Sequence, residues 1–392
     1  MRKGHKHVSK KDNDHTLPFD LFFEIFLRLS AKTIARCRCV SKLWSSILCR
    51  QDFTDLFLKI SSARPQLLFS FKLNGKWLFF SSPQPQNPDG NLSLLATNHH
   101  MCLRSRTGSR LVNAPARGLL CTQYIWLKDG FKDLKAMVYN PSTGQSITLP
   151  KVITRRAEAR TYLGYDPINK QVKVLCMSLC TMLKKAEEHQ VLTLGTKNPS
   201  WRKIECSLPH FPISGGICID GILYYLADQN KGTPKPRFPK PYTVVCFDVM
   251  SEKFTFIHQA LDNNVNWYPA LINCNGKLGV LRQDHNGCFS GTTRSLELWV
   301  LDDVEKLKWL RQIYVLPPLW KNLVANTRLN IVGMTGNGEF VFSPAVLRDP
   351  FYIFYYNVEK NTIVRVIIQG IGPVSGQEIY TFIDHVEDLK RM

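Results

Sequence analysis

The sequence predicts a multidomain α+β protein, with a small three-helix module at the N-terminus and a large all-β, propeller-like domain of about six four-stranded blades. Three patterns lead to this fold class. Apolar residues follow helical spacing near the N-terminus, turn dipeptides then recur every 43 to 62 residues, and a second strand–turn–strand pattern recurs between them. We divide the chain into a disordered basic tail (1–12), the helical module (13–57), a linker (58–65), the β domain (66–380) and a C-terminal tail (381–392).

Composition indicates a soluble, intracellular protein. The 392 residues are 44% hydrophobic, and the longest apolar stretch, Leu21 to Leu29, is interrupted by Glu24 and Arg28. We therefore expect no membrane span and no secretory signal, and a cytoplasmic or nuclear location. The twelve cysteines are scattered, so we expect reduced thiols rather than a disulfide framework.

The formal net charge of +20 suits an acidic partner such as nucleic acid, an anionic membrane or an acidic protein face. The excess of basic residues is spread over both parts of the chain instead of forming one stripe. This distribution argues against nucleic acid and against a membrane as partners, and it favours an ordinary solvated surface.

The helical module begins at Leu17-Pro18, where proline suits the first helical position. From Phe19 to Leu29 only one narrow stripe is polar, so most of the helix surface requires burial. Ser30 is predicted to cap a second short helix and Ser41 a third.

Three short helices cannot enclose this many large apolar side chains, because small domains bury too little of their surface. Two alternatives follow. The uncovered face packs against the rest of the same chain, or it binds another protein.

The residues LPFDLFFEIFLRL (17–29), AKTIARCRCVSKLWSSIL (31–48) and Phe53 closely resemble the F-box, in its plant version. Ser30 departs from the proline that is usual there, and serine serves as a helix cap instead. The resemblance implies binding of a Skp-type adaptor and, through it, of a cullin-RING ubiquitin ligase. The positions that it implies for the adaptor-facing surface are Leu17, Pro18, Leu21, Ile25, Leu29, Val40 and Trp44. Some of them, notably Trp44, have the alternative role of holding the three helices together.

The β domain is marked by turn dipeptides that separate short apolar runs. They are Asn74-Gly75, Arg117-Gly118, Asp166-Pro167, Asp220-Gly221, Asn275-Gly276 and Asn337-Gly338. Asn-Gly and Asp-Gly favour tight hairpins, because both central residues of a type I′ turn need positive φ. A second hairpin pattern, as in VYNPSTGQSITLP, recurs between the dipeptides, so that each unit contains two hairpins and forms one four-stranded blade. The alternative is an open or two-layer β-sandwich.

The segments VYNPSTGQSITLP, LGYDPINKQVKVLCM, WRKIECSLPH, GICIDGILYYLA and VCFDVMSEKFTFI are similar to the F-box-associated, kelch-like β-propeller domain of plant F-box proteins. The resemblance covers about residues 66–370. It implies a substrate receptor that binds a target protein.

The sequence contains little that indicates catalysis. No G-x-S-x-G, H-E-x-x-H or P-loop occurs, so we expect a protein that is not an enzyme and has no cofactor. A zinc site can be assembled on paper from Cys176-x3-Cys180 with His189 and from Cys206-x3-His210 together. Because Cys176 falls in a predicted strand rather than a chelating turn, we expect no metal.

Aromatic and basic residues in loop-like segments are our candidates for target binding. They are Trp267, Tyr268, Trp320 and Arg237. Packing of the aromatic residues between blades, and a passive connector around Arg237, are the alternatives.

We therefore expect the substrate-recognition subunit of a Skp-cullin-F-box type E3 ubiquitin ligase. The alternative is a basic β-propeller that binds RNA or another polyanion without a ligase role. A propeller hydrolase is a weaker third reading, which requires converging carboxylates in the central channel.

Overall fold

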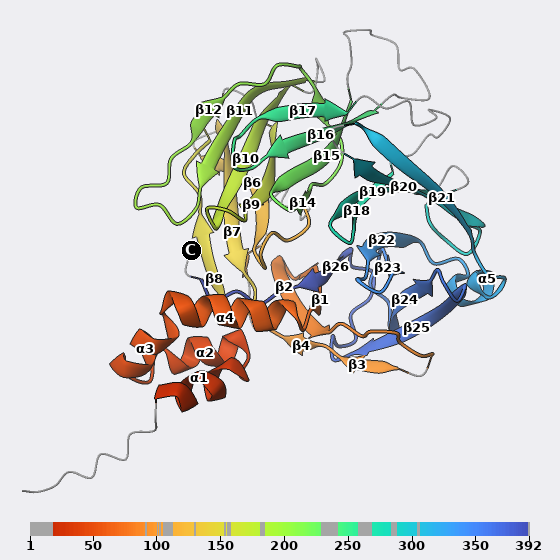
Figure 1. Cartoon of the computed structure of the whole chain (residues 1–392), viewed down its shortest axis with the longest axis horizontal. Coiled ribbons are helices and arrows are strands. Elements are labelled where there is room, and N and C mark those ends of the chain that lie inside the picture. Colours follow the sequence, from red (N-terminus) through yellow and green to blue (C-terminus); the bar gives the residue numbers. More distant parts are fainter. Residues whose placement is uncertain are drawn as a thin grey trace, which may run out of the picture.

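The N-terminal module contains four helices, and a ring of β-sheets follows it (Figure 1). The structure is a computed structural model. It describes residues 19–90, 92–99, 101, 103–104, 113–128, 131–152, 154, 158–180, 185–228, 242–257, 269–283, 288–303 and 306–390. None of the helices in this part of the chain has the length and apolar character needed to cross a membrane.

The helices are α1 (Phe19–Leu27), α2 (Ala31–Cys37), α3 (Lys42–Leu48) and α4 (Gln51–Ser62). Both predicted caps are confirmed, because Ser30 Oγ accepts the Thr33 N–H at 3.3 Å and Ser41 Oγ accepts the Trp44 N–H at 3.1 Å. The three predicted helices are confirmed, but a fourth, α4, was missed, so the predicted linker at 58–65 was wrong for most of its length. The apolar residues Phe53 and Phe57 recur at helical spacing and are buried, so the helix continues through most of that range.

The β domain consists of six sheets, as predicted, and each is one blade. Blade 1 contains β26 (Ile379–His385), β1 (Gln66–Leu73), β2 (Lys76–Pro83) and, both beside β2, β4 (Thr97–Asn98) and β5 (Leu103–Arg104). Blade 2 contains β6 (Leu120–Lys128), β7 (Phe131–Asn140) and β8 (Gln145–Thr148). Blade 3 contains β9 (Glu158–Asp166), β10 (Gln171–Cys180), β11 (Lys185–Thr193) and β12 (Arg202–Ile204).

Blade 4 contains β13 (Phe211–Pro212) and β14 (Ile217–Ile219), which both pair with β15 (Ile222–Asp228), and then β16 (Tyr242–Asp248) and β17 (Phe254–Ile257). Blade 5 contains β18 (Ala270–Cys274), β19 (Lys277–Gln283), β20 (Ser295–Asp303) and β21 (Lys308–Val315). Blade 6 contains β22 (Leu329–Met334), β23 (Glu339–Pro344), β24 (Phe351–Asn357), β25 (Thr362–Gln369) and β3 (Ser93–Leu95). The short helix α5 (Leu319–Val324) lies between blades 5 and 6 in the chain.

The turn dipeptides explain the hairpins. Asn74, Asp220 and Asn275 have φ values of 49°, 45° and 51°, and the glycine after each also has positive φ. These turns join β1 to β2, β14 to β15 and β18 to β19. Local sequence therefore accounts for these three hairpins, whereas at Asn337-Gly338 only the glycine has positive φ.

The ring closes by pairing of segments from opposite ends of the chain. The C-terminal strand β26 pairs antiparallel with β1, and β3 pairs parallel with β25. The predicted C-terminal tail at 381–392 was therefore wrong for its first part, since β26 extends to His385. This strand was missed because its partner in the sheet lies more than 300 positions earlier in the chain.

The core of the ring is divided into six apolar clusters, and each cluster lies between two neighbouring blades. The cluster between blades 1 and 2, for example, includes Phe79 and Tyr139, whose ring centroids are 5.1 Å apart. Six sheets with six interfaces form a closed ring, and this arrangement leaves few strand edges exposed.

Candidate protein-binding surfaces and the C-terminal clasp

The helical module has its own apolar core. Phe26 of α1, Ile34 of α2 and Leu48 of α3 are at most 3% exposed, and they pack with Phe53 and Phe57 of α4. All four helices contribute to this core, and Leu389 from the C-terminal end of the described chain belongs to it as well.

Three of the predicted adaptor-facing residues lie outside this core. Leu21 is 42% exposed, Ile25 is 48% exposed and Val40 is 65% exposed. Leu21 and Ile25 are one helical turn apart on α1, so they share a face. In Figure 1, α1, α2 and α3 lie on the side of the module that faces away from the propeller, with α4 nearest to it.

Of the other four predicted adaptor-facing positions, two are partly buried and two lie outside the described residues. Leu29 and Trp44 are partly buried against the core of the module, and the ring centroids of Trp44 and Phe26 are 5.2 Å apart. Trp44 therefore has the alternative role of holding the helices together. Leu17 and Pro18 lie outside the described residues. Leu43, which the sequence reasoning did not select, is 51% exposed on α3.

A short segment after β26, residues 386–390, connects the helical module to the propeller, and we call it the C-terminal clasp. The side chain of Leu389 is 1% exposed and belongs to the core of the helical module. The guanidinium group of Arg38 in α2 donates to the Leu389 carbonyl at 3.1 and 3.2 Å and to the Leu48 carbonyl at 2.7 Å. One end of the clasp is thus part of the helical module.

The clasp also contacts the propeller. Arg117 Nε and Asp388 Oδ2 form an ion pair at 2.7 Å, and both side chains are at most 6% exposed. Asn140 Nδ2 donates to the Asp388 carbonyl at 2.7 Å. Gly118 is required beside the clasp, because it has a φ of 71° and a Cβ atom there would lie 2.3 Å from the Val386 carbonyl oxygen.

Glu387 completes the attachment to the helices. Its backbone N–H donates to Ser61 Oγ at 2.7 Å, and its carboxyl group accepts the Ala31 N–H at the start of α2 at 3.3 Å. Burial raises the pKa of this carboxyl group, and the bond from Ala31 opposes that effect.

A separate ion pair joins Lys170, in the turn between β9 and β10, to Asp55 of α4 at 2.9 Å. These contacts come from α2, α4 and blades 2 and 3. They fix the orientation of the helical module relative to the ring.

Only one of the predicted target-binding residues lies in the described part of the chain. Trp320 is 1% exposed, and its Nε1 donates to the Ser290 carbonyl at 2.8 Å. It packs in the cluster between blades 5 and 6, so its selection as a target anchor was wrong and the packing alternative is correct. Trp267, Tyr268 and Arg237 lie outside the described residues.

The outer strand of blade 5 carries an exposed apolar surface that the sequence reasoning missed. Ile313 and Val315 share one face of β21 and are 56% and 68% exposed, and Leu310, on the other face, is 44% exposed. Within the described residues β21 pairs only with β20, so one backbone edge is free. An exposed apolar edge strand is a common protein-binding element.

A cavity of about 460 Å³ lies between the innermost strands of blades 1, 4, 5 and 6. Of the described residues that line it, Glu378 is the one with a carboxyl group. A pair of converging carboxylates, which the hydrolase reading requires, does not occur among these residues.

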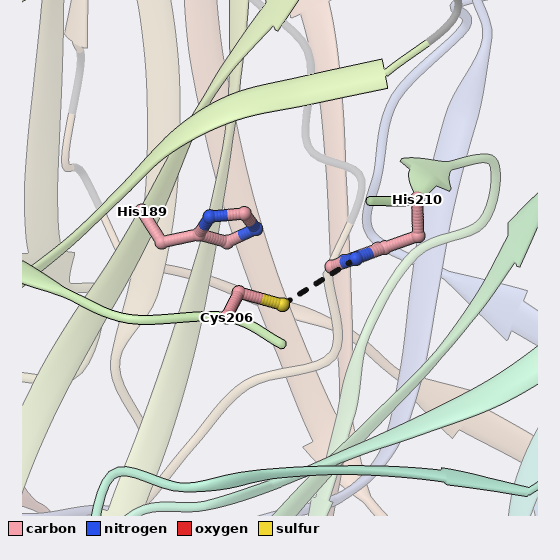
Figure 2. Close-up of side chains that lie close together, drawn as sticks. All are labelled: His189, Cys206 and His210. Carbon is pink, nitrogen blue, oxygen red and sulfur yellow. Dashed lines mark hydrogen bonds between the residues drawn. The ribbon is translucent and has the colours of Figure 1, made fainter. Parts of the chain in front are cut away.

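A further cluster joins three residues that can bind a metal ion: His189 of β11, Cys206 and His210 (Figure 2). Their ligand atoms lie within 4.8 Å of one another, and Cys206 Sγ is 3.8 Å from His210 Nδ1. Burial, followed by the neighbouring His210, lowers the pKa of His189 to about 3, and burial also lowers the pKa of His210. Both imidazoles are therefore neutral at pH 7.

The cluster contains three of the five residues from which a zinc site was assembled on paper, and it lacks Cys176 and Cys180. Cys176 lies in β10, as predicted, and packs between blades 2 and 3. His189 packs toward blade 4, where its ring centroid is 5.2 Å from that of Phe254. The two side chains therefore lie on opposite faces of the same blade. Cys180 is not part of the cluster either. What the sequence reasoning missed was the pairing of β11 with β12, which brings His189 to the Cys206-x3-His210 segment.

Comparison with known protein families matches both parts of the chain. Residues 15–56 match the F-box domain, and residues 66–386 match the F-box associated beta propeller domain. The second match is not to a kelch family, so the kelch-like part of the expectation is not confirmed.

Similar proteins from Arabidopsis thaliana match over nearly the whole chain. F-box protein At3g49450 is 45% identical over 381 residues, which are 96% of this chain and 92% of that protein. F-box protein DOR is 45% identical over 98% of this chain and 96% of that protein. F-box protein At1g53790 is 46% identical over 96% of this chain and 82% of that protein.

Proposed function

The chain belongs to the F-box proteins that carry an F-box-associated β-propeller domain, and we propose from this membership that it is the substrate-recognition subunit of a Skp-cullin-F-box type E3 ubiquitin ligase. In this role α1 to α3 bind a Skp-type adaptor, and the propeller binds the target protein.

The observation that carries the proposal is the exposure of Leu21, Ile25 and Val40 on a module whose own core is already filled. Large apolar side chains next to a complete core are not needed for folding of the module. Their burial against a partner releases about 25 cal/mol for each Å² of apolar surface. Helix α1, which carries Leu21 and Ile25, lies on the side of the module away from the propeller, so a partner that binds α1 there leaves the ring accessible (Figure 1).

The clasp supports the second half of the proposal. A ligase acts faster when the target is held near the ubiquitin-loaded enzyme, because its lysines then have a high effective concentration. A flexible joint between adaptor and target would dilute this effect. The contacts of Arg38, Leu389 and Asp388 provide a rigid joint instead.

The proposal is tested by assembling the full chain with a Skp-type adaptor and a cullin, and analysing the mixture by size-exclusion chromatography. We expect one complex that contains all three proteins. Ile25→Asp should abolish it, because an unpaired carboxylate buried in an interface costs about 3 kcal/mol or more, roughly 100-fold in affinity.

Leu310→Asp is the matched control, since Leu310 has nearly the same exposure (44%) but lies on blade 5. This variant should assemble normally. Assembly of Ile25→Asp as efficient as that of the wild type would contradict the proposal. In that event a steep loss of RNA binding with salt would support the polyanion alternative.

A further inference from the structure

The three metal-ligating side chains of the cluster converge from two elements at the outer part of blade 3. His189 lies on β11, and Cys206 and His210 lie in the segment between β12 and β13. Figure 2 shows the two rings and the thiol directed toward a common space. The spacing Cys-x3-His within one loop is within the range found for chelating segments in zinc proteins.

The separation of the ligand atoms fits a tetrahedral ion. Zinc binds sulfur at about 2.3 Å and nitrogen at about 2.0–2.1 Å, so a tetrahedral site places sulfur and nitrogen about 3.5 Å apart. Cys206 Sγ and His210 Nδ1 are 3.8 Å apart, and none of the three ligand atoms is more than 4.8 Å from another. The separations therefore have to shrink by about 1.3 Å at most to complete the geometry.

His189 provides an independent indication of a ligand. Its side chain is only 7% exposed, and among the described residues no hydrogen-bond partner lies within reach of its Nε2. A buried polar atom without a partner is rare in native structures, because it loses its water without compensation. A metal ion next to Cys206 supplies the missing partner.

His210 has the outer contacts that are typical of a metal ligand. Its Nε2 lies 2.7 Å from the Tyr225 hydroxyl, and that hydroxyl donates to Met177 Sδ at 3.5 Å. In this arrangement Nε2–H donates to Tyr225, and the lone pair of Nδ1 faces Cys206. Without a metal, Nδ1–H donates instead to the Leu208 carbonyl at 3.0 Å. Metal binding therefore moves the imidazole proton from Nδ1 to Nε2.

The thiol of Cys206 donates to the same Leu208 carbonyl at 3.3 Å, and it loses its proton when a metal binds. A groove of about 1180 Å³ borders the cluster and is lined in part by His189, Cys206 and Phe254. The groove leaves room on this side for a water molecule as a fourth ligand.

We propose that His189, Cys206 and His210 bind one zinc ion, with a water molecule as the fourth ligand on the side of the groove. The soft thiolate and the two imidazoles select a transition metal of this class over magnesium or calcium. The ion ties the 205–210 segment to β11.

The test uses the full-length protein, treated with a chelator and then titrated with Co²⁺ and with Zn²⁺. Cobalt reports its ligands by a thiolate-to-metal charge-transfer band and by the visible bands of a tetrahedral ion. We expect the protein to bind one equivalent of Co²⁺ with both signatures, and we expect Zn²⁺ to displace this cobalt. The melting temperature of the protein should rise when zinc is added. Cys206→Ser should lose the charge-transfer band, and Tyr225→Phe should bind about 10-fold more weakly because the orientation of His210 is lost.

Cys39→Ser is the matched control, because Cys39 is an exposed cysteine of the helical module. It should retain the site in full. A charge-transfer band that survives Cys206→Ser but disappears in Cys39→Ser would overturn the proposal, and so would the absence of metal binding by the folded wild type. Cys206 is partly exposed and serine has nearly the same size, so the variant should melt at the wild-type temperature without metal.

Discussion

Replacement of Leu389 by alanine tests whether the clasp holds the helical module in place. The side chain is 1% exposed and packs among apolar residues of the helices, including Ile34 and Phe53. Truncation of a buried leucine to alanine costs about 2 to 5 kcal/mol, which combines lost transfer free energy with the cavity left behind. The loss should fall on the helices, because Leu389 packs with residues of that module.

Hydrogen–deuterium exchange measured by mass spectrometry resolves where the stability is lost. Peptides from α2 and α3 of Leu389→Ala should exchange at least about 30-fold faster than those of the wild type, the equivalent of 2 kcal/mol. Leu329→Ala is the matched control, since Leu329 is 2% exposed but packs between blades 5 and 6. Its effect should be confined to the propeller. Unchanged exchange of α2 in Leu389→Ala would refute a structural role of the clasp.

Three further predictions concern the ion pair, pH and helix capping. Asp388→Asn should lower the free energy of unfolding by about 3 kcal/mol, because it leaves Arg117 buried without its counter-charge, and denaturant titration measures the loss. Burial lowers the pKa of His385 to about 3, so the imidazole takes up a proton more readily in the unfolded chain than in the folded one. Its contribution to the free energy of unfolding is therefore constant above pH 6.5 and decreases as the pH falls from 6.5 to 3. His385→Gln should therefore flatten the dependence of the unfolding free energy on pH by about 1.4 kcal/mol per unit over this window. Ser30→Ala should cost about 1 kcal/mol through loss of the cap on α2, read from the melting temperature of the helices.

Each of these predictions has its own contradicting result. A double replacement, Arg117→Met with Asp388→Leu, should cost much less than the sum of the single changes, and simple additivity would argue against the ion pair. An unchanged pH slope in His385→Gln would show that the imidazole does not resist protonation in the fold. Ser30→Thr should retain the cap, so equal losses in Ser30→Thr and Ser30→Ala would exclude capping as the cause.

Much of the fold could be predicted because its signals are local. The hairpin turns depend on dipeptides such as Asn74-Gly75, whose backbone conformation is set by those two residues. The apolar character of α1 could likewise be predicted from helical spacing, whereas the choice of Ile25 over the buried Phe26 came from the resemblance to the F-box. Local sequence determines these features, so they can be read without knowledge of the remaining chain.

The clasp could not be predicted, and the sequence named the three residues of the cluster without showing that they meet, because both features depend on distant contacts. Leu389 lies between Asp388 and Lys390, and its helical partner Arg38 is 351 positions away. Nothing in its neighbourhood marks it as a core residue. His189 meets Cys206 only through the register of β11 with β12. Cys176 pairs with Gln190, the neighbour of His189, and successive residues of a strand face opposite sides, so Cys176 cannot join the cluster.

Titration of a Skp-type adaptor into the full chain by isothermal calorimetry tests the central claim most directly. We expect binding with one adaptor per chain and a negative heat-capacity change, because apolar surface around Ile25 becomes buried. Ile25→Asp should give no binding heat, while Leu310→Asp should match the wild type. Equal heats for wild type and Ile25→Asp, or no binding by the folded wild type, would contradict the account.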